Sequence, residues 1–381
     1  MSDFDTVLSN LRNVSNEFAA NATERRQRRQ LERADFDQLA TAGFLRVGVP
    51  ASMGGLWQGL EQSVRPYNEM VHTIAQGDPC VGLVAAMHPC VLAYWLAEVN
   101  APDTYIDAWE AQRTRCFKTA LDGHWWGTLT SEPGSGGDIM RTRTLAEPMT
   151  GDERHRLTGD KHFGSGSGIS SFMTTTAREK DAEFPVLYFM DMREARWDGS
   201  QGLQIISEWD GHGMIATQSH AFRLEKFPAT PMAWPDGLPE VMKTAAPLAG
   251  SLFTSVIVAV VEQAVEFVRE KLAPKQDTMR PYEQVEWSRA VNEAWLIRQA
   301  YDGMLRAVEN NENGLVAVTR GKAAIAELSE SCLQRLSRVA GGASFARSMP
   351  LGQWAQDVRA LGFLRPPWGL AYDNVFKMSW E

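Results

Sequence analysis

The sequence has 381 residues, of which 44% are hydrophobic and 22% are charged, and its formal net charge is -9 at pH 7. This composition is typical of globular proteins and excludes a disordered or fibrous chain. The acidic balance and the scattered basic residues argue against a nucleic-acid surface, and the length predicts two or three domains.

The only concentrated run of basic residues is the stretch 24–33, "ERRQRRQLER", which we interpret as a solvated helix face. No stretch approaches the run of about 20 apolar residues that a membrane span needs. The first ten residues lack the basic and then apolar pattern of a secretory signal. We therefore expect a cytoplasmic protein with no membrane partner and no nucleic-acid partner.

The thiol and imidazole side chains do not predict a metal centre. Cys80, Cys90, Cys116 and Cys332 have no close metal-ligand spacing, and the seven histidines have no HExxH or CxxC companion. Four cysteines in so long a chain also do not form a disulfide framework. We expect buried thiols and no metal site.

Helical periodicity dominates the first part of the chain, where apolar residues recur every three or four positions in the stretches 36–47 and 81–99. From Gly127 to about Thr230 the pattern changes to short strand-like runs separated by Gly, Asp and Pro. This middle stretch is predicted to be a compact β domain.

Helical periodicity returns in the stretches 247–272, 288–309 and 318–341, which have the length of bundle helices. The first half of 247–272 is apolar on nearly all sides, so it should lie inside a bundle or at a subunit contact. The sequence therefore predicts an α+β fold with domains at 1–126 (helical), 127–232 (β) and 233–381 (helical bundle with a closing loop).

A glycine-rich stretch, "TSEPGSGGD" at 130–138, directly follows a predicted strand. It lacks the GK[ST] ending of a phosphate loop, because Asp138 stands after the paired glycines. It also lacks the third glycine and the following helix of a dinucleotide fingerprint. Both phosphate interpretations fail, and a plain β-turn remains one alternative.

Five stretches in the same order resemble the acyl-CoA dehydrogenase superfamily. They are "VPASMGG", "LTSEPGSGGD", "GDKHFGSGSG", "EWDGHGMIATQSHAFRL" and "RVAGGASFARSMPLGQWAQDVRA". The resemblance covers most of the chain. It implies an N-terminal α-helical domain, a middle β-barrel domain and a C-terminal four-helix bundle, in agreement with the periodicity.

The resemblance also implies a flavin site on the glycine-rich stretch. Backbone groups of Leu129 and Thr130 and the hydroxyl of Ser131 would bind the pyrimidine edge of the flavin, and Phe163 and Ser165 would lie at its N5 region. A flavin ring carries several hydrogen-bonding atoms that need partners in a dry pocket. Matched positions for the nucleotide tail, some from a neighbouring subunit of a homotetramer (a dimer of dimers), are Arg269, Gln284, Gly341 and Gly342.

The chain departs from the superfamily at the catalytic base. Acyl-CoA dehydrogenases use a glutamate as general base. Counting eight residues from Asp357 along the family pattern gives Arg365, and the alternative position on the first bundle helix gives Lys243. Arginine stays protonated and cannot accept a proton. Gln353 and Gln356 also replace two arginines of the family.

This departure makes the chain most similar to the two-component (group D) flavin-dependent monooxygenase branch. The resemblance implies reduced FMN or FAD from a separate NAD(P)H-flavin reductase, and O2. One oxygen atom would be inserted into an aromatic or heteroaromatic small molecule through a flavin hydroperoxide. Ser165 would stabilise this species, because its hydroxyl can hold a protonated N5.

A dry, aromatic substrate pocket would protect such chemistry from water. His88 lies in an apolar helix, where relatives place a histidine that faces the flavin, so we assign it a catalytic and substrate-binding role beside Trp95. The closing loop "LRPPWGLAYDN" brings Arg365 and Trp368 toward the substrate. Arg365 is expected to pair with a substrate carboxylate or with a local acid.

Two other functions remain open at this point. The chain could be an acyl-CoA dehydrogenase with a non-standard base, for which Glu240 and Asp373 are the candidates. It could also be a noncatalytic descendant that binds a flavin or an acyl group without turnover.

Overall fold

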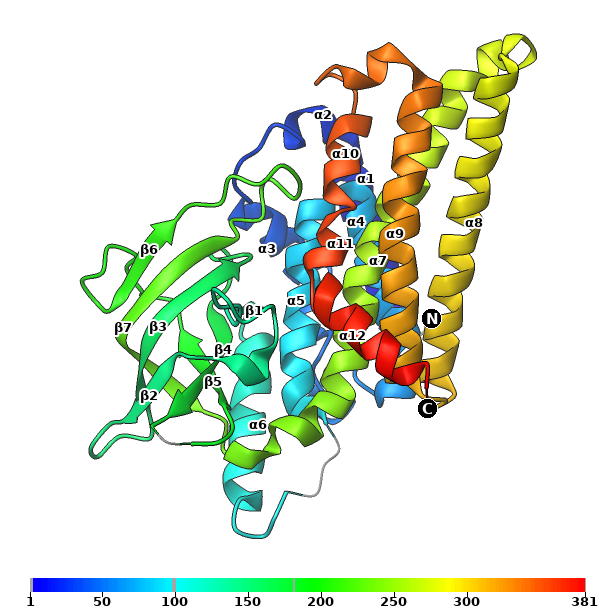
Figure 1. Ribbon diagram of the computed structural model, residues 1–381. Coiled ribbons are helices and arrows are strands. Elements are labelled where there is room, and N and C mark those ends of the chain that lie inside the picture. The colour runs from blue at the N-terminus through cyan, green and yellow to red at the C-terminus, as the bar shows by residue number, and fades with distance from the viewer. Residues whose placement is uncertain (1–2, 98–100, 181, 381) are drawn as a thin grey trace.

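The computed structural model describes residues 3–97, 101–180 and 182–380. Figure 1 shows a strand-rich part on one side of a long helical part. The N-terminal helices are α1 (Asp3–Ala20), α2 (Ala22–Arg25), α3 (Arg33–Thr41), α4 (Leu60–Gly77), α5 (Pro79–Leu96) and α6 (Ile106–Leu121).

Helix α5 lies between the strand-rich part and the C-terminal helices (Figure 1). Its start is fixed by Asp78, whose carboxylate accepts hydrogen bonds from the main-chain N–H groups of Cys80 and Val81, and Pro79 occupies the first turn. Apolar residues surround the helix on all sides, and nearly all of them are buried. A helix of this kind is stable only inside a core.

The middle part is a β-barrel. Its strands are β1 (Trp126–Thr128), β2 (Leu145–Pro148), β3 (His155–Gly164), β4 (Phe172–Glu179), β5 (Val186–Asp191), β6 (Leu203–Ser207) and β7 (His220–Pro231). The pairings β4–β2–β3–β7–β5 return to β4 and close the circuit. β1 pairs with the first half of β4 in parallel, and β6 pairs with β7.

The C-terminal part contains long antiparallel helices followed by short ones. They are α7 (Leu238–Leu272), α8 (Pro281–Glu309), α9 (Gly314–Ala340), α10 (Leu351–Asp357), α11 (Ala360–Phe363) and α12 (Trp368–Met378). The order of helices, β-barrel and helices confirms the α+β fold class expected from the sequence.

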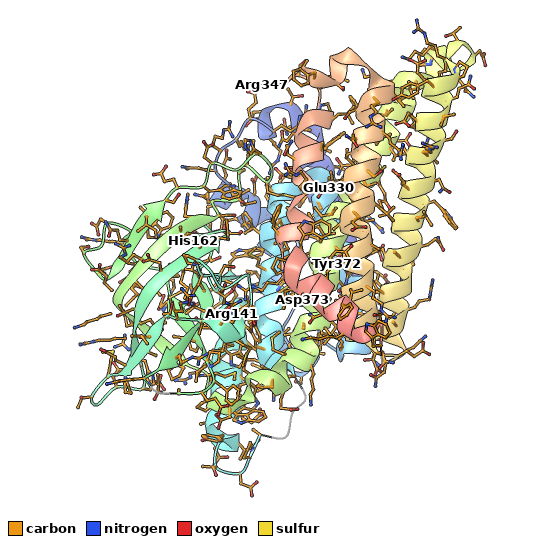
Figure 2. All side chains as sticks on the ribbon, in the orientation of Figure 1. Arg141, His162, Glu330, Arg347, Tyr372 and Asp373 are labelled. Carbon is orange, nitrogen blue, oxygen red and sulfur yellow. The ribbon has the colours of Figure 1, made fainter. Side chains whose placement is uncertain are left out.

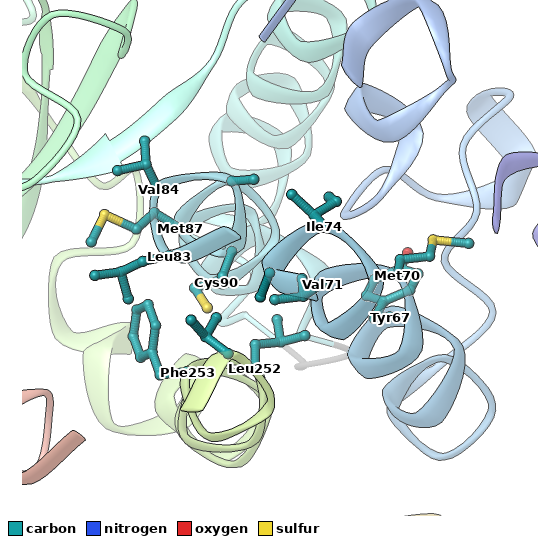
Figure 3. Close-up of a cluster of buried hydrophobic side chains, with 14 of the residues drawn as sticks. Tyr67, Met70, Val71, Ile74, Leu83, Val84, Met87, Cys90, Leu252 and Phe253 are labelled. Carbon is teal, nitrogen blue, oxygen red and sulfur yellow. The ribbon is translucent and has the colours of Figure 1, made fainter. Parts of the chain in front are cut away.

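The two helical parts share one hydrophobic core, while the barrel has its own. In Figure 3 side chains of α4 (Val71), α5 (Leu83, Cys90) and α7 (Leu252, Phe253) meet at the centre of the helical core. Two helical segments, Pro79–Leu96 and Pro235–Thr278, are long and apolar enough to cross a membrane by composition. However, 89% and 83% of their apolar windows are buried in the protein, as in core helices of a soluble protein.

The basic stretch near the N-terminus differs from the expectation of a fully solvated helix face. Arg25 is buried, and its guanidinium bonds Asp35 and Asp78 at 2.8 Å each. The expectation fails at this residue because two carboxylates from other segments compensate its charge, which local charge patterning cannot reveal. The four cysteines are free and buried, as predicted.

Candidate flavin site

The residues expected at the flavin edge lie where the chain leaves β1 and meets the C-terminal loop (residues 364–367). Nη2 of Arg365 donates hydrogen bonds to Oγ1 of Thr130 and, at 3.0 Å, to Oγ of Ser131. Tyr94 of α5 lies close enough to interact electrostatically with Arg365. We call these four residues, Tyr94, Thr130, Ser131 and Arg365, the junction.

The glycine-rich stretch packs directly on the C-terminal loop. Gly137 has a φ of +80°, and a Cβ atom there would lie 2.5 Å from Cγ of Pro367. Only glycine combines this backbone conformation with such a close approach. The glycine-rich stretch therefore holds the C-terminal loop against the residues that follow β1.

Part of the main chain at the junction remains available for a ligand. The N–H of Leu129 is already bonded to the Thr174 carbonyl at 2.8 Å. Thr130 is buried, and its main-chain N–H has no hydrogen-bond partner among the described residues. A buried donor without a partner is costly, so a ligand acceptor at Thr130 would satisfy it. The junction thus fits the polar edge of a flavin at Thr130 and Ser131 better than at Leu129.

A buried ion pair fixes the glycine-rich stretch to β3. Glu132 and Lys161 have side-chain exposures of 4% and 0%, and Nζ of Lys161 lies 2.5 Å from Oε1 of Glu132. The same carboxylate accepts hydrogen bonds from the side chains of Thr142 and Thr144. Burial opposes the charge of Glu132, but the Lys161 charge and these bonds lower its pKa to about 2.

The C-terminal loop is fixed by a second buried cation. Lys322 of α9 is 2% exposed, and its ammonium donates to the carbonyls of Leu361 (2.7 Å), Leu364 (3.0 Å) and Pro366 (2.9 Å). These three bonds use all three ammonium protons. Burial lowers the pKa of Lys322 to about 8. The bonded carbonyls flank Arg365, so Lys322 fixes the segment that carries this guanidinium.

Ser165 belongs to a short chain of hydroxyl groups with a defined direction. Its Oγ lies 2.7 Å from Oγ of Ser219, which lies 2.7 Å from Oγ1 of Thr217, which lies 2.8 Å from the Met214 carbonyl oxygen. Each of these three contacts needs one proton, and the three hydroxyls supply three. The carbonyl cannot donate, so every hydroxyl donates toward Met214. The oxygen of Ser165 is therefore left as an acceptor.

Two features position the turn that follows β3. Gly166 has a φ of +73°, and a Cβ atom there would lie 2.5 Å from Cγ1 of Val84, so α5 presses directly on the turn that carries Ser165. Phe163 has a φ of +60°, lies in an irregular part of the β3–β7 register and is 58% exposed. Its ring lies edge-to-face with the rings of His162, at 6.0 Å, and Trp209, at 6.2 Å. This exposed ring next to Ser165 is suited to stack on a planar ligand.

His88 lies in the core with both ring nitrogens bonded. Nδ1 accepts the N–H of Trp126 at 3.2 Å, so Nε2 carries the proton and donates to the Leu45 carbonyl at 3.3 Å. Desolvation lowers the pKa of His88 to about 4, and the ring is neutral. A role of this histidine in oxygen chemistry stays a prediction, and it would require one of the two bonds to break.

The two tryptophans assigned to the substrate pocket have different surroundings. Trp95 is buried, its Nε1 donates to Oε1 of Gln112 at 3.1 Å, and its ring packs on Trp126 at 5.2 Å. Trp368 stacks on Tyr372 at 6.0 Å and lines a surface hollow with Glu327 and Glu330. Neither residue belongs to the junction, so their contact with a substrate stays a prediction.

The residues assigned to a nucleotide tail gather at one end of the helical part, where α7 ends, α8 begins and α9 ends (Figure 1). Arg269 is exposed and paired with Glu266, and Gln284 borders an open groove between α8 and α9. No neighbouring atom lies within 4 Å of a Cβ added at Gly341 or Gly342. These four positions lie apart from the junction within one chain, and their role stays a prediction.

The carboxylates considered as alternative bases lie on the surface. Glu240 is 45% exposed and pairs with Lys243 at 2.7 Å. Asp373 is exposed on α12, as Figure 2 shows. Asp357 is a buried carboxyl whose pKa burial raises to about 7, but its Oδ1 accepts the N–H of Met214 at 2.5 Å, in the interior. None of these three surroundings provides a dry, accessible carboxylate at the junction.

Sequence reasoning missed Tyr94, Lys322 and the hydroxyls of Thr217 and Ser219. For Lys322 a signal existed, because it falls on the apolar stripe of its helix, between Val318 and Ile325. A lysine on such a stripe is rarely buried without a specific partner. The hydroxyl chain gives no comparable signal, since serine and threonine in a loop carry no periodicity. Among the described residues, no cluster of His, Cys, Asp and Glu could hold a metal ion.

The helices and the closed barrel together form an acyl-CoA dehydrogenase fold. The structure is similar to that of FMN-bound TdsC from Paenibacillus sp. A11-2, with a TM-score of 0.77 and 17% identity over 97% of this chain and 95% of that chain. TdsC is named as a dibenzothiophene monooxygenase and also has a structure with FMN and indole.

Two further structures share the fold. Methanesulfinate monooxygenase MsuC from Pseudomonas fluorescens has a TM-score of 0.76 and 19% identity, over 98% of this chain and 95% of that chain. Nitrososynthase from Micromonospora carbonacea var. africana has a TM-score of 0.79 and 16% identity, over 100% of this chain and 97% of that chain. No protein-family model matches the chain, and no curated protein matches it. At these identities the similarity establishes the fold.

Proposed function

We propose that this protein is a reduced-flavin-dependent monooxygenase, the oxygenase component of a two-component system. The observation that carries the proposal is the direction of the hydroxyl chain, which leaves Ser165 as an acceptor. The N5 atom of a reduced flavin is a donor, whereas that of an oxidised flavin is an acceptor. Ser165 therefore favours the reduced form. The FMN-bound neighbour TdsC supports a flavin on this fold.

The residues that would hold the flavin come from two strands and their turns. The N–H of Thr130 and the hydroxyl of Ser131 would bind the pyrimidine edge, Phe163 would stack on the ring, and Ser165 would accept from N5. Bound reduced flavin would supply activation of O2, through a flavin hydroperoxide as the resemblance implies. The residues of this chain then keep water away and hold the N5 proton in place.

The proposal extends to the substrate, the reductase partner, the cellular compartment and the assembly of the protein. The substrate is an aromatic or heteroaromatic small molecule, consistent with the indole bound to TdsC. A separate NAD(P)H-flavin reductase supplies FMN or FAD in reduced form, and His88 and Trp95 shape the inner wall behind the substrate. The chain acts in the cytoplasm as a homotetramer whose nucleotide-tail residues, such as Gln284, serve a neighbouring subunit.

The competing dehydrogenase function lacks a suitable base. A carboxylate works as a base near neutral pH when apolar surroundings tune its pKa. Glu240 and Asp373 are both exposed, and the position of the family glutamate carries Arg365. Dehydrogenase activity would therefore depend on a group that the junction does not contain.

Anaerobic titration with oxidised and reduced FMN and FAD tests the proposal. We expect tighter binding of the reduced form, and a smaller preference in Ser165→Ala and Ser219→Ala, since both changes disturb the acceptor. Ser207→Ala, on the exposed strand β6, serves as the control. Adding O2 should then give the hydroperoxide absorbance, with more peroxide release from Ser165→Ala. Tight oxidised FAD that an acyl-CoA bleaches would instead establish a dehydrogenase, and no flavin binding would indicate a noncatalytic protein.

A further inference from the structure

We propose that Arg365 binds an anionic oxygen group of the substrate, such as a carboxylate, and so makes the protein selective for acids over their neutral analogues. The anion site stands on the geometry of the junction alone. Its assignment to the substrate rests on the proposed monooxygenase function.

Among the described residues, Arg365 is a cation that forms no ion pair with an acid. Its hydrogen bonds go only to the neutral hydroxyls of Thr130 and Ser131, and among the described residues no carboxylate oxygen lies within ion-pair distance of it. Its electrostatic neighbours include Tyr94, Asp138 and Lys161. The local acid that the sequence left open as a partner for Arg365 is therefore not in bonding contact. A half-buried cation that has no carboxylate in bonding contact among the described residues attracts an anion.

The guanidinium has free donors in a fork arrangement. Both hydroxyl bonds come from Nη2, so Nη1 and Nε have no hydrogen-bond partner among the described residues. A guanidinium offers five N–H donors, and two adjacent nitrogens match the two oxygens of a carboxylate. A single neutral carbonyl would use only part of this capacity.

The guanidinium is also held in place before any ligand binds. Lys322 fixes the carbonyls of Leu361, Leu364 and Pro366, and Pro367 packs against Gly137. A preorganised donor loses little conformational entropy on binding and contributes more to affinity. The arrangement therefore favours a specific anion site over a mobile surface cation.

The flavin itself is the main rival ligand for Arg365. The pyrimidine edge of the ring can be satisfied by the N–H of Thr130 and the hydroxyl of Ser131, without a second cation. Tyr94 of α5 lies close enough to interact electrostatically with Arg365. Arg365 thus combines a charge with a neighbouring phenol, which suits a small organic acid.

The test uses isothermal titration with matched acid and amide pairs, namely acetate and acetamide, benzoate and benzamide, and indole-3-acetate and indole-3-acetamide. In the wild-type protein, saturated with reduced FMN under anaerobic conditions and also without it, at least one acid should bind 10-fold or more tighter than its amide. Arg365→Gln should remove this preference and leave amide binding unchanged. Arg365→Lys should retain part of it, because the charge stays and the fork is lost.

Arg359→Gln is the matched control, because this exposed arginine belongs to neither site and, among the described residues, its side chain has a hydrogen bond to Gln356 alone. The proposal is overturned if no acid is preferred by the wild type, or if the preference survives in Arg365→Gln. It is also overturned if Arg365→Gln weakens reduced FMN binding and leaves any acid preference intact, because Arg365 would then serve the flavin. If the wild type prefers acids but binds no flavin, the anion site stands and the monooxygenase function fails.

Discussion

The barrel and the C-terminal loop both bury a cation, but they do so in different ways. In the barrel, Lys161 bonds Glu132 at 2.5 Å, and both side chains are almost fully enclosed. At the C-terminal loop, Lys322 of α9 bonds main-chain carbonyls and Arg365 bonds hydroxyls, and among the described residues neither pairs with a carboxylate. The first region neutralises its charge internally, and the second keeps positive charge beside the junction.

This difference distinguishes a structural role of the barrel ion pair from a ligand-binding role of Arg365. Burying an ion pair requires the desolvation of both charged groups. Its main effect is to fix a geometry, here the position of the glycine-rich stretch. A cation without a carboxylate partner fixes no geometry through an ion pair. It is typical of a site where a ligand supplies the opposite charge. The comparison predicts that changes in the barrel pair affect stability, while changes at Arg365 affect binding.

The largest effect is expected for Glu132→Gln. This change leaves Lys161 charged and uncompensated, and it should lower the free energy of unfolding by about 3–5 kcal/mol. Burial already lowers the pKa of Lys161 to about 8, and Glu132 opposes that shift. Without Glu132 the folded state holds the Lys161 proton still less tightly, so the rise in stability with pH should begin at a lower pH in the variant than in the wild type. Urea unfolding at several pH values measures this.

The double variant Glu132→Gln with Lys161→Met provides the control for the barrel pair. Removing both charges should recover part of the lost stability, because the uncompensated charge is gone. Equal destabilisation in the single and double variants would show that the hydrogen bonds of Glu132 matter and its charge does not.

Lys322→Met should have the next largest effect. Methionine fills a similar volume, but the carbonyls of Leu361, Leu364 and Pro366 lose their donor, which should cost about 1–3 kcal/mol. We expect faster proteolysis within 361–380 and weaker acid selectivity at Arg365. Lys377→Met, at the exposed end of α12, should leave both unchanged.

Asp357→Asn tests a buried acid that has no cation partner among the described residues. Burial raises the pKa of Asp357 to about 7, above the ordinary value of 3.8. The folded state therefore binds the proton more tightly, and wild-type stability should fall as pH rises from about 4 through 7. Asparagine keeps an acceptor for the N–H of Met214 and carries no charge. The variant should gain about 1 kcal/mol or more over the wild type between pH 5 and 8, since one pKa unit is about 1.4 kcal/mol.

Thermal melts of both Asp357 proteins at matched pH values check the prediction. A constant difference in stability between them from pH 5 to 7 would contradict it, because the gain must grow where the unfolded carboxyl has lost its proton and the folded one still holds it.

The smallest effect on stability is expected for Arg365→Gln. Glutamine keeps an amide donor, and the change removes a charge that pairs with no acid among the described residues. The free energy of unfolding should change by less than about 1 kcal/mol in either direction. Urea unfolding of the ligand-free protein measures this. A loss as large as that of Glu132→Gln would mean that Arg365 is structural, and it would end the distinction between the two regions.

Much of the fold could be predicted because its signals are local. Periods of three and four residues marked α5 and the long C-terminal helices, and glycine and proline marked the limits of the barrel strands. The candidate site was predicted in part. Thr130, Ser131, Phe163, Ser165 and Arg365 were all named from the sequence, and the structure brings Thr130, Ser131 and Arg365 into direct contact. Lys322 could also have been found, from its place on an apolar stripe.

The sequence by itself determined the fold class and the replacement of the family glutamate by Arg365, because both depend on the order and spacing of residues along the chain. Only the tertiary structure decided which groups are satisfied and which remain available. Thr130 and Arg365 are 235 residues apart, and the acceptor role of Ser165 depends on a hydroxyl 54 residues away. Hydrogen bonding and charge compensation act through space, so burial and partners from distant segments set the chemistry of each side chain.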